Sequence, residues 1–430
     1  MAAGPHELSP RERRRRKRRR QQFTYTLITI LLIAALAAGV FFGVRYAYGR
    51  FFAPAPAADE GISVPQVVEA PGASAGEGES VALSPEEQLN GEIAAKISEM
   101  TLEDKAAALF FVTPDQLTGM ENITQAGETT QAALRSYPVA GIVYEPGNLT
   151  DRSQISDMLS ATKKMSRYPL VLAVEEPGGD AGSAVAKALG ATEALSPAEI
   201  AASNNTSAAQ EAGNLIGAYL AQAGFNMNIT PCANIAQDAS SAGAYGDNMQ
   251  MVSGMSVAMI KGLHGQSILT CTGRFPAPCA EDPGGREGVT ATQRSMGELE
   301  TDEFVPFRDC ITAGTDIVML SNISAPRAIG GNTPCTFSET LIHDELRSTL
   351  GYSGVVMTAP LDQEAITSGY TADHAAVAAI AAGADLLYRP ENFLLAHKGI
   401  VDAVENGVLT EERIDQSLKR IFRLKYLSLK

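Results

Sequence analysis

Signatures of metal, disulfide and nucleotide chemistry are scarce in this sequence of 430 residues. Its five cysteines include no Cys-x-x-Cys pair, which excludes the common zinc motifs and a disulfide-dense scaffold. No His, Asp or Glu cluster has the spacing of metal ligands, so we expect neither metal nor cofactor. Neither Gly-x-Gly-x-x-Gly after a strand nor Gly-x₄-Gly-Lys-Ser/Thr occurs, so nucleotide binding lacks its motifs.

Positive charge is scarce outside the N-terminus. The formal net charge is −15, but residues 1–50 hold eleven Lys or Arg and two Glu, a net of +9 that leaves −24 for residues 51–430. A domain this acidic does not attract nucleic acid or an anionic surface through its general field. We therefore expect no nucleic-acid partner.

The longest apolar run follows a basic stretch near the N-terminus. Residues 11–20 read RERRRRKRRR, and residues 23–44 are 22 uncharged, mostly apolar residues, enough to cross the ~30 Å hydrocarbon layer. Flanking positive charge predicts a cytoplasmic N-terminus. A cleaved signal peptide or a nucleic-acid-binding arm is the alternative, but the run is long and lacks a well-placed cleavage site. We predict a cytoplasmic tail at 1–22, a transmembrane helix at 23–44 and an extracytoplasmic remainder.

A tether and a folded domain follow the predicted span. Residues 45–84 are predicted to be a flexible linker, since most of this stretch is rich in Pro, Ala, Gly, Ser and Glu and lacks hydrophobic periodicity. Ser84 then precedes Pro85 and two glutamates, the pattern of a capped helix N-terminus. We therefore place the folded domain at 85–430.

Short β-rich runs alternate with segments of helical spacing throughout this domain. Near-continuous apolar strands separated by helices indicate a parallel sheet covered by helices. Eight such units in about 340 residues suit a closed (β/α)₈ barrel of the TIM type better than an open doubly wound sheet. Functional residues should then follow the strands, at their carboxyl ends. The predicted strands are 109–113, 141–144, 170–174, 227–230, 268–271, 317–320, 355–357 and 385–388, and the predicted helices include 211–223, 255–264, 300–313 and 375–382.

Several colinear segments resemble glycoside hydrolase family 3, especially its single-domain β-N-acetylhexosaminidase branch. MTLEDKAAALFFV at 100–112 resembles the family's opening, YPLVLAVEEPGG at 168–179 resembles IPLLIAVDQEGG, and GFNMNITPCANIA at 224–236 resembles GINVNFAPVLDI. The tail GVLTEERIDQSLKRIFRLK at 407–425 extends the match, which covers about residues 90–428 in family order. The resemblance implies a (β/α)₈ barrel and a retaining mechanism with a carboxylate nucleophile and an acid/base.

The resemblance also implies that the catalytic groups are lost. The family's nucleophile is the first Asp of TDDLxMxAI, and this chain reads TAPLDQEAI at 358–366, which places Ala359 there. Its acid/base is a His in KHFPGHG, and this chain reads GRFPAPC at 273–279, which places Pro278 there. A methyl group cannot form a glycosyl ester, and proline has no side-chain proton to transfer.

Positions that resemble the family's sugar-binding residues have changed too. Nearby acidic residues are an alternative source of catalytic carboxylates. Arg274 beside Glu175 suggests an ion pair, or else an anion contact. A retaining pair needs carboxyls roughly 5 Å apart, and an inverting pair needs them roughly 6.5–9.5 Å apart. The other loop acids are either such a relocated catalytic pair or ordinary solvent-exposed surface residues. The former sugar-pocket positions are Glu175, Pro177, Asn234, Gly273 and Arg274, and the candidate compensating carboxylates are Glu281, Asp282, Asp362 and Glu364.

Three cysteines follow or end the predicted fourth and fifth strands, so we expect them near the barrel mouth. These are Cys232, Cys271 and Cys279. Because oxidation is permitted outside the membrane, we predict a disulfide within this trio, either Cys271–Cys279 or Cys232 with one of them. Buried apolar thiols are the alternative.

The function expected from these features is that of a membrane-anchored, extracytoplasmic family 3-like pseudoenzyme. Its role would be binding or scaffolding at the cell envelope, with a carbohydrate or an envelope protein as partner. The first alternative is an active β-N-acetylhexosaminidase or β-glucosidase type of enzyme that cleaves cell-wall sugars with relocated carboxylates. An unrelated activity on the same barrel is the second, because a fold alone does not determine function.

Overall fold

The computed structural model describes residues 83–180, 182–236, 244–276 and 290–429. All of them belong to one compact unit, Val81–Lys430. The predicted tail, the predicted transmembrane helix at 23–44 and nearly all of the predicted linker lie outside the described residues. Within the described ranges, no helix combines the length and the apolar character needed to cross a membrane.

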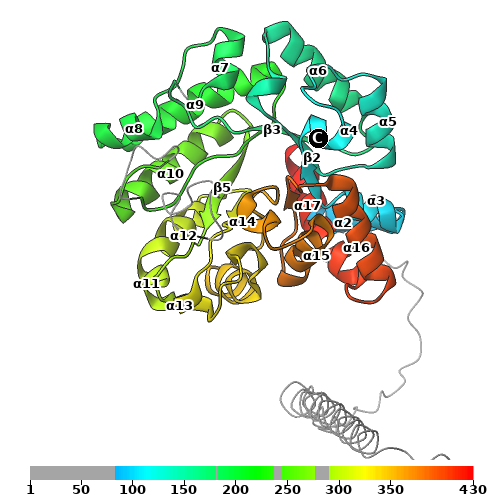
Figure 1. The fold of residues 1–430 in the computed structure, drawn as a ribbon. Helices are drawn as coiled ribbons and strands as arrows, with labels where there is room; N and C mark the ends of the chain where they lie inside the picture. Colours follow the sequence, from blue (N-terminus) through cyan, green and yellow to red (C-terminus); the bar gives the residue numbers. More distant parts are fainter. Residues whose placement is uncertain (1–82, 181, 237–243, 277–289, 430) are drawn as a thin grey trace, which may run out of the picture. The chain divides into compact units, whose positions relative to one another are not determined.

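Eight parallel strands form a barrel, which confirms the predicted fold class (Figure 1). Each strand pairs with its neighbours in sequence order, and β8 pairs with β1. A single bridge between Met357 and Leu386 joins the seventh strand to the eighth and closes the ring. The strands are β1 (Phe110–Val112), β2 (Gly141–Tyr144), β3 (Val171–Val174), β4 (Met227–Asn228), β5 (Leu269–Phe275), β6 (Ile317–Leu320), β7 (Val355–Met357) and β8 (Leu387–Tyr388).

All the predicted strands occur, but some of their bounds differ from the prediction. Two of these differences arise where a proline, or a glycine and an arginine, interrupts the apolar run. β2, β6 and β7 have the predicted bounds. β4 ends at Asn228 rather than at Thr230, which precedes a proline that has no N–H for a ladder. β5 runs on to Phe275 through a register shift after Thr272. The glycine and arginine in that extension interrupt the apolar run, so periodicity alone ended the strand too early.

Helices surround the strands in the order that an alternating α/β chain requires (Figure 1). Ser84 caps the first of them, as predicted, and its hydroxyl and the Glu87 carboxylate form a capping box. The helices are α2 (Pro85–Ser98), α3 (Leu102–Ala107), α4 (Pro114–Thr118), α5 (Glu128–Ser136), α6 (Arg152–Met165), α7 (Ala184–Leu189), α8 (Pro197–Ser203), α9 (Thr206–Ala223), α10 (Met249–His264), α11 (Met296–Glu298), α12 (Phe304–Thr312), α13 (Pro326–Ile329), α14 (Glu364–Thr367), α15 (Ala372–Ala382), α16 (Phe393–Glu405) and α17 (Glu411–Ser428).

Three of the four predicted helices begin earlier than their periodicity indicates. α9 and α10 start after Asn205 and Asn248, whose side chains accept hydrogen bonds from the first helical turns. The predicted helix at 300–313 is divided into a π-helical segment and α12. The short helical segments are η1 (Pro146–Asn148), η3 (Leu299–Glu303), η4 (Cys335–Phe337) and η5 (Thr340–Thr349), of which η3 and η5 are π-helical.

α17 covers the amino-terminal end of the barrel with an apolar face that contains one lysine. Ile421, Leu424 and Lys425 line a small cavity together with residues at the beginnings of β2, β3 and β6. Lys425 is only 1% exposed. Its ammonium lies 5.5 Å from the centre of the Phe422 ring. Burial lowers the pKa of Lys425 to about 7, because the low-dielectric interior disfavours the charged form.

We expect Lys425→Met to stabilise the protein most at neutral and acidic pH. Because the folded-state pKa lies below the value of 10.5 for an exposed lysine, the unfolded chain binds the proton more tightly between the two values. Wild-type stability should therefore rise from pH 7 to pH 10, and the variant should lose this rise. Urea unfolding should show a gain of roughly 2–4 kcal/mol at pH 7 that shrinks by pH 10.

The matched control for this experiment is Lys419→Met, an exposed position on the same helix. Its free energy of unfolding should stay within about 0.5 kcal/mol of wild type at both pH values. A gain for Lys425→Met that has the same size at pH 7 and pH 10 would contradict the assigned burial of the charge.

Candidate functional site

The carboxyl ends of the strands hold most of the predicted site residues. The positions that can be assessed follow β3, β4 and β7, or lie within β5. They are Glu175, Pro177, Cys232, Asn234, Cys271, Gly273, Arg274, Ala359, Asp362 and Glu364. Pro278, Cys279, Glu281 and Asp282 lie outside the described residues.

The segment after β7 presents a buried methyl group where the resemblance places a nucleophile. Ala359 is 1% exposed. The backbone around it is bound to the end of β8, where the Thr358 N–H donates to the Leu386 carbonyl at 2.9 Å and the Leu361 N–H to the Tyr388 carbonyl at 2.9 Å. The segment is therefore held in place by main-chain hydrogen bonds and presents no reactive group at this point.

Asp362, one of the candidate compensating carboxylates, belongs to an ion-pair network at the mouth, which we call the mouth triad. Its Oδ2 lies 2.9 Å from both Nε and Nη2 of Arg389. Nη1 of Arg389 lies 2.6 Å from Oε1 of Glu145. The three residues follow β7, β8 and β2, so the triad spans the carboxyl end of the intervening β1. Burial raises the pKa of Asp362, and the Arg389 guanidinium opposes this shift.

Glu364, the second candidate on this segment, is the first residue of α14 and is exposed. Gln363 lies between the two acids and accepts a hydrogen bond from the Asn322 amide at 2.9 Å. The same amide donates to the Pro360 carbonyl at 2.7 Å. Asp362 and Glu364 therefore occupy different environments, and among the described residues only Asp362 of this pair has an ionic partner.

The end of β3 carries two adjacent glutamates with opposite environments. Glu175, a former sugar-pocket position, is exposed, whereas Glu176 is fully buried. Glu176 accepts hydrogen bonds from the backbone N–H groups of Val185 and Ala186, both at 3.1 Å, and from the Tyr219 hydroxyl at 2.9 Å. Burial raises the pKa of Glu176, and the backbone donors oppose this shift.

Glu176 is the polar residue that the sequence reasoning missed. Neighbouring residues on a strand point to opposite faces, so two consecutive acids at a strand end indicate that one of them lies inside. Its backbone is also held, because the Asn228 side chain accepts from the Glu176 N–H and donates to the Glu176 carbonyl, both at 2.9 Å. Glu176 thus joins the ends of β3 and β4 to α7 and α9, and its carboxylate is occupied by these contacts.

Asn234 holds the main chain at the end of β5. Its amide donates to the Arg274 carbonyl at 2.7 Å, and its oxygen accepts from the Arg274 N–H at 2.5 Å. An aspartate, which the resemblance implies here, could accept from this backbone but could not donate to it. Within the described ranges Arg274 forms no ion pair with Glu175, so the expectation of that pair is wrong. The acid is turned toward solvent, while Asn234 holds the arginine's backbone on the β4 side.

Gly273 also reflects the packing of β5 rather than ligand binding. It is buried, and a Cβ atom added there would lie 3.3 Å from the Cβ of Met319 on β6. The lysine that the resemblance implies would therefore require Met319 to shift. Pro177, by contrast, is partly exposed and follows Glu176 directly. Of the former sugar-pocket positions, Glu175 is the one that offers an exposed charged group.

The cysteines near the mouth have different states. Cys232 is disulfide-bonded. Cys271 is a buried free thiol, and burial raises its pKa well above the usual value. The predicted Cys271–Cys279 bridge and a Cys232–Cys271 bridge are therefore wrong, because Cys271 is a free thiol. The predicted pairing of Cys232 with Cys279 stays a prediction, since Cys279 lies outside the described residues.

Metal binding has no support in this part of the chain. Within the described ranges, no group of three or more His, Cys, Asp or Glu residues could hold a metal ion. Arg389 ties Asp362, and Glu176 is enclosed by hydrogen-bond donors. The exposed carboxylate of Glu175 and the mouth triad are charged groups at this end of the barrel.

We expect Arg389→Met to destabilise the protein in a pH-dependent manner. Removing the guanidinium leaves the largely buried Asp362 without its cation, which should cost roughly 1–3 kcal/mol at pH 7.5. The pKa of Asp362 is already raised, and it should rise further in the variant. Since a carboxyl with a raised folded-state pKa costs stability only while ionised, the deficit should shrink as the pH falls toward 5.

Chemical unfolding at pH 7.5 and pH 5 measures this effect, with Arg389→Lys as the variant that keeps the charge. Arg389→Met combined with Asp362→Asn should recover part of the loss at pH 7.5. If Arg389→Met loses the same stability at both pH values and the second substitution recovers none, the mouth triad has no electrostatic role.

Comparison with known proteins provides the family. The profile of the glycosyl hydrolase family 3 N-terminal domain matches residues 101–424. A solved family 3 β-N-acetylglucosaminidase from Paenibacillus sp. superposes with a TM-score of 0.69 at 27% identity, covering 76% of this chain. The match covers 62% of that Paenibacillus chain. M tuberculosis LpqI superposes with a TM-score of 0.67 at 22% identity, covering 77% of this chain and 96% of its own, and shows the fold alone.

Curated relatives are similar over more than half of the chain. A β-hexosaminidase from Stenotrophomonas maltophilia is 24% identical over 285 residues, which cover 64% of this chain and 81% of the relative. A β-hexosaminidase from Tolumonas auensis is 27% identical over 282 residues, with the same two coverages of 64% and 81%.

Proposed function

The chain belongs to glycosyl hydrolase family 3, and we propose that it is a member that binds carbohydrate at the cell envelope without hydrolysing it. The observation that carries this proposal is Ala359, a buried methyl group at the end of β7 where the family resemblance places the nucleophile. Its relatives are named β-hexosaminidases, so N-acetylhexosamine-containing sugars are the proposed ligand class.

The surroundings of Ala359 argue against simple replacement of the missing group. Retaining hydrolysis needs a carboxylate that can reach the anomeric carbon and a second group roughly 5 Å away. Asp362 is three residues further on and has its Oδ2 bound to two nitrogens of Arg389. To act as a nucleophile it would have to leave this pair, in a segment fixed to β8 by backbone hydrogen bonds.

The same mouth keeps groups that suit sugar binding. The exposed Glu175 carboxylate can accept hydrogen bonds from sugar hydroxyls. Its neighbour Glu176 is rigidly held by α7 and by Tyr219, which fixes the backbone that carries Glu175. A binding function requires this preorganisation but requires no proton transfer.

We expect no hydrolysis of a chromogenic N-acetyl-β-glucosaminide or β-glucoside by the full-length protein, because the nucleophile position holds a methyl group. A curated β-hexosaminidase assayed in parallel provides the positive control. N-acetylglucosamine oligosaccharides should nevertheless bind in calorimetry, and Glu175→Ala should weaken binding about tenfold, as expected for loss of charged hydrogen bonds. Glu364→Ala, which removes an exposed acid at the start of α14, is the matched control and should change little.

One observation favours a different outcome, an enzyme with relocated catalytic groups. Asp362 is a carboxyl at the mouth whose pKa is raised by burial, a property that general acids share. Turnover by the natural protein that is abolished in Asp362→Asn would establish that alternative and refute the proposal. Turnover unaffected by Asp362→Asn would refute it as well and would place the catalysis on other residues.

The proposal includes a single membrane anchor at residues 23–44, with the barrel on the extracytoplasmic side. Support comes from the basic stretch at 11–20 and from the length of the apolar run. The full-length protein should stay in the membrane pellet after alkaline carbonate extraction, and deletion of 23–44 should release it. Protease added outside intact cells should digest the barrel. A mature N-terminus beyond residue 44 would instead indicate a cleaved signal peptide.

A further inference from the structure

A second hollow lies at the opposite end of the barrel from the mouth. It is a cavity of about 240 Å³ between η5, the end of α15 and α17. The residues beside it precede β7 and β8, so they belong to the amino-terminal end of these strands. A volume near 30 Å³ per water leaves room for a small ion with its remaining hydration shell. The charged and polar lining residues are Glu339, His343, Arg347, Arg413, Gln416 and Arg420, and we call this hollow the arginine pocket.

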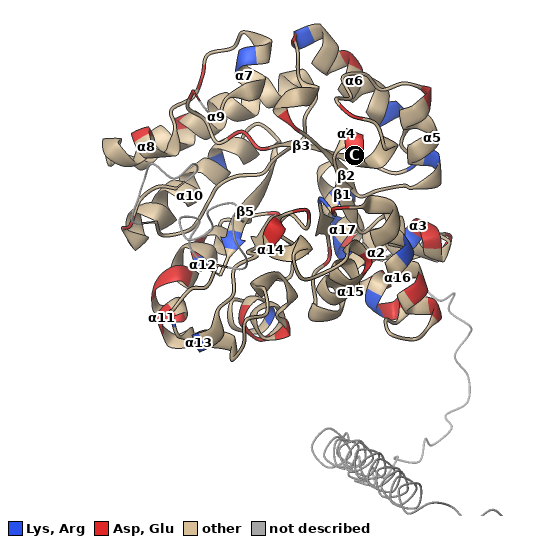
Figure 2. Ribbon diagram, in the orientation of Figure 1, with Lys and Arg blue, Asp and Glu red and all other residues tan. Residues whose placement is uncertain are grey.

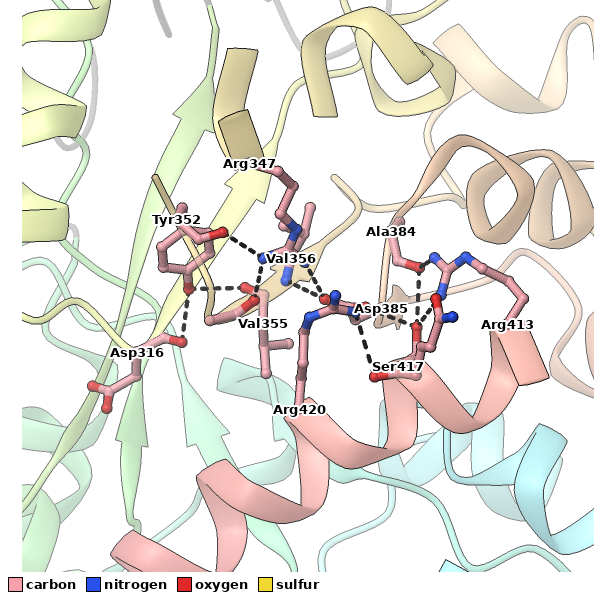
Figure 3. Close-up of polar contacts among 12 residues, drawn as sticks. Asp316, Arg347, Tyr352, Val355, Val356, Ala384, Asp385, Arg413, Ser417 and Arg420 are labelled. Carbon is pink, nitrogen blue, oxygen red and sulfur yellow. Dashed lines mark hydrogen bonds and ion pairs between the residues drawn. The ribbon is translucent and has the colours of Figure 1, made fainter. Parts of the chain in front are cut away.

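The three arginines of this pocket surround one buried carboxylate (Figure 3). Asp385 is fully buried and accepts from Arg347 Nη2 at 2.6 Å and from Arg420 Nη1 at 3.1 Å. It also accepts from the Ser417 hydroxyl at 2.7 Å and from the Val356 N–H at 3.0 Å. A carboxylate has about four acceptor positions, so Asp385 is saturated.

The remaining contacts of Arg347 and Arg413 are made with neutral groups. Arg347 Nη1 donates to the backbone carbonyls of Tyr352 at 2.9 Å and Gly354 at 2.5 Å. Arg413 donates to the Ala384 carbonyl and to the Ser417 hydroxyl, both at 2.7 Å (Figure 3). These contacts satisfy hydrogen bonds without neutralising charge. Among the described lining residues only the exposed Glu339 is acidic, so at least one positive charge remains uncompensated.

Burial lowers the pKa of Arg347 and that of Arg413. Attraction to Asp385 opposes this shift, and repulsion from the neighbouring arginines adds to it. Figure 2 shows acidic residues spread over the ring of helices, including α8, α11 and α14. A concentrated positive site is therefore exceptional in residues 51–430, whose formal net charge is −24.

Arg420 supplies unused hydrogen-bond donors to the pocket. Its side chain is 34% exposed, and Nη1 contacts Asp385 and the Gln416 carbonyl. In the described part of the chain, its Nε and Nη2 groups have no acceptor. A structural role in closing the barrel accounts for Arg347 and Asp385. It does not account for a third guanidinium that leaves donors beside an open cavity.

We propose that the arginine pocket binds a dianionic oxyanion of the phosphate type. Guanidinium groups bind phosphate oxygens through paired N–H donors, and more than one converging arginine favours a dianion over a monoanion. The shared chemistry is a phosphate group, carried by the free ion or by a small phosphorylated molecule. This inference concerns the end of the barrel opposite to the sugar site, so it does not depend on the proposed carbohydrate function.

Calorimetric titration of the full-length protein with inorganic phosphate, at constant ionic strength against chloride, tests this proposal. We expect saturable binding of one phosphate per chain. Arg420→Gln should weaken it at least tenfold, as expected for loss of a charge-assisted pair of hydrogen bonds. Gln416→Glu should weaken it as well, because this exposed side chain places a negative charge in the lining without touching the Asp385 contacts.

Arg423→Gln is the matched control on the same helix. Arg423 is 42% exposed, pairs with Glu86 at 3.1 Å and does not line the pocket. Phosphate affinity should therefore match that of wild type, and thermal melting in chloride confirms that each variant is folded. No saturable heat up to about 10 mM phosphate would overturn the proposal, as would equal weakening by Arg423→Gln.

A sugar phosphate titrated in parallel distinguishes the two sources of the phosphate group. Tighter binding of the sugar phosphate, lost in Arg420→Gln, supports the proposal and assigns the pocket to a phosphorylated molecule. Equal affinity for both supports the proposal and assigns the pocket to the free ion. If only non-saturable, salt-like effects occur with either compound, the excess positive charge has no ligand and the proposal is wrong.

Discussion

The closure of the barrel between β7 and β8 is the constraint on which the rest of the structure depends. This seam has one recognised bridge, between Met357 and Leu386, whereas most other neighbouring strands share longer ladders. Asp385 reinforces it with both backbone and side chain, since its N–H donates to the Val356 carbonyl and its carboxylate accepts from the Val356 N–H. Without this seam the parallel sheet would present two open edges.

The two ends of the seam use charge in different ways. At the mouth, Arg389 after β8 is held between Asp362 and Glu145, so two acids surround one cation. At the base, three arginines surround Asp385. The mouth triad therefore leaves negative charge, and the base leaves positive charge. A ligand that carries a phosphate group suits the positive base. Neutral ligands with hydroxyl groups suit the mouth, because the excess negative charge there would repel an anionic ligand.

The sequence predicts the barrel well because its strands are buried on both faces and read as unbroken apolar runs, as in β2, β6 and β7. It predicts polar groups poorly, since their partners come from other strands. The pairing of Asp362 with Arg389 joins segments after β7 and β8, and no local spacing indicates it. Arg413 and Arg420 did carry a signal, because seven residues separate them and place them on one face of a helix. Cys271 is a buried free thiol within β5, which is the alternative that the sequence left open for these cysteines.

The substitutions at the mouth share one physical consequence. Asn234 donates to and accepts from the same backbone segment, which an aspartate could not do, and Asp362 forms an ion pair. Catalytic groups are kept in strained or unpaired states that cost stability, and a site released from catalysis can satisfy them locally. Asn234 stands where the family resemblance implies a sugar-binding aspartate, and Asp362 lies three residues after the implied nucleophile, so their local pairing is compatible with the proposed binding function. The sequence around Ala359 still aligns with the family motif, because the main-chain hydrogen bonds from this segment to β8 stabilise the barrel and do not depend on the side chain at position 359.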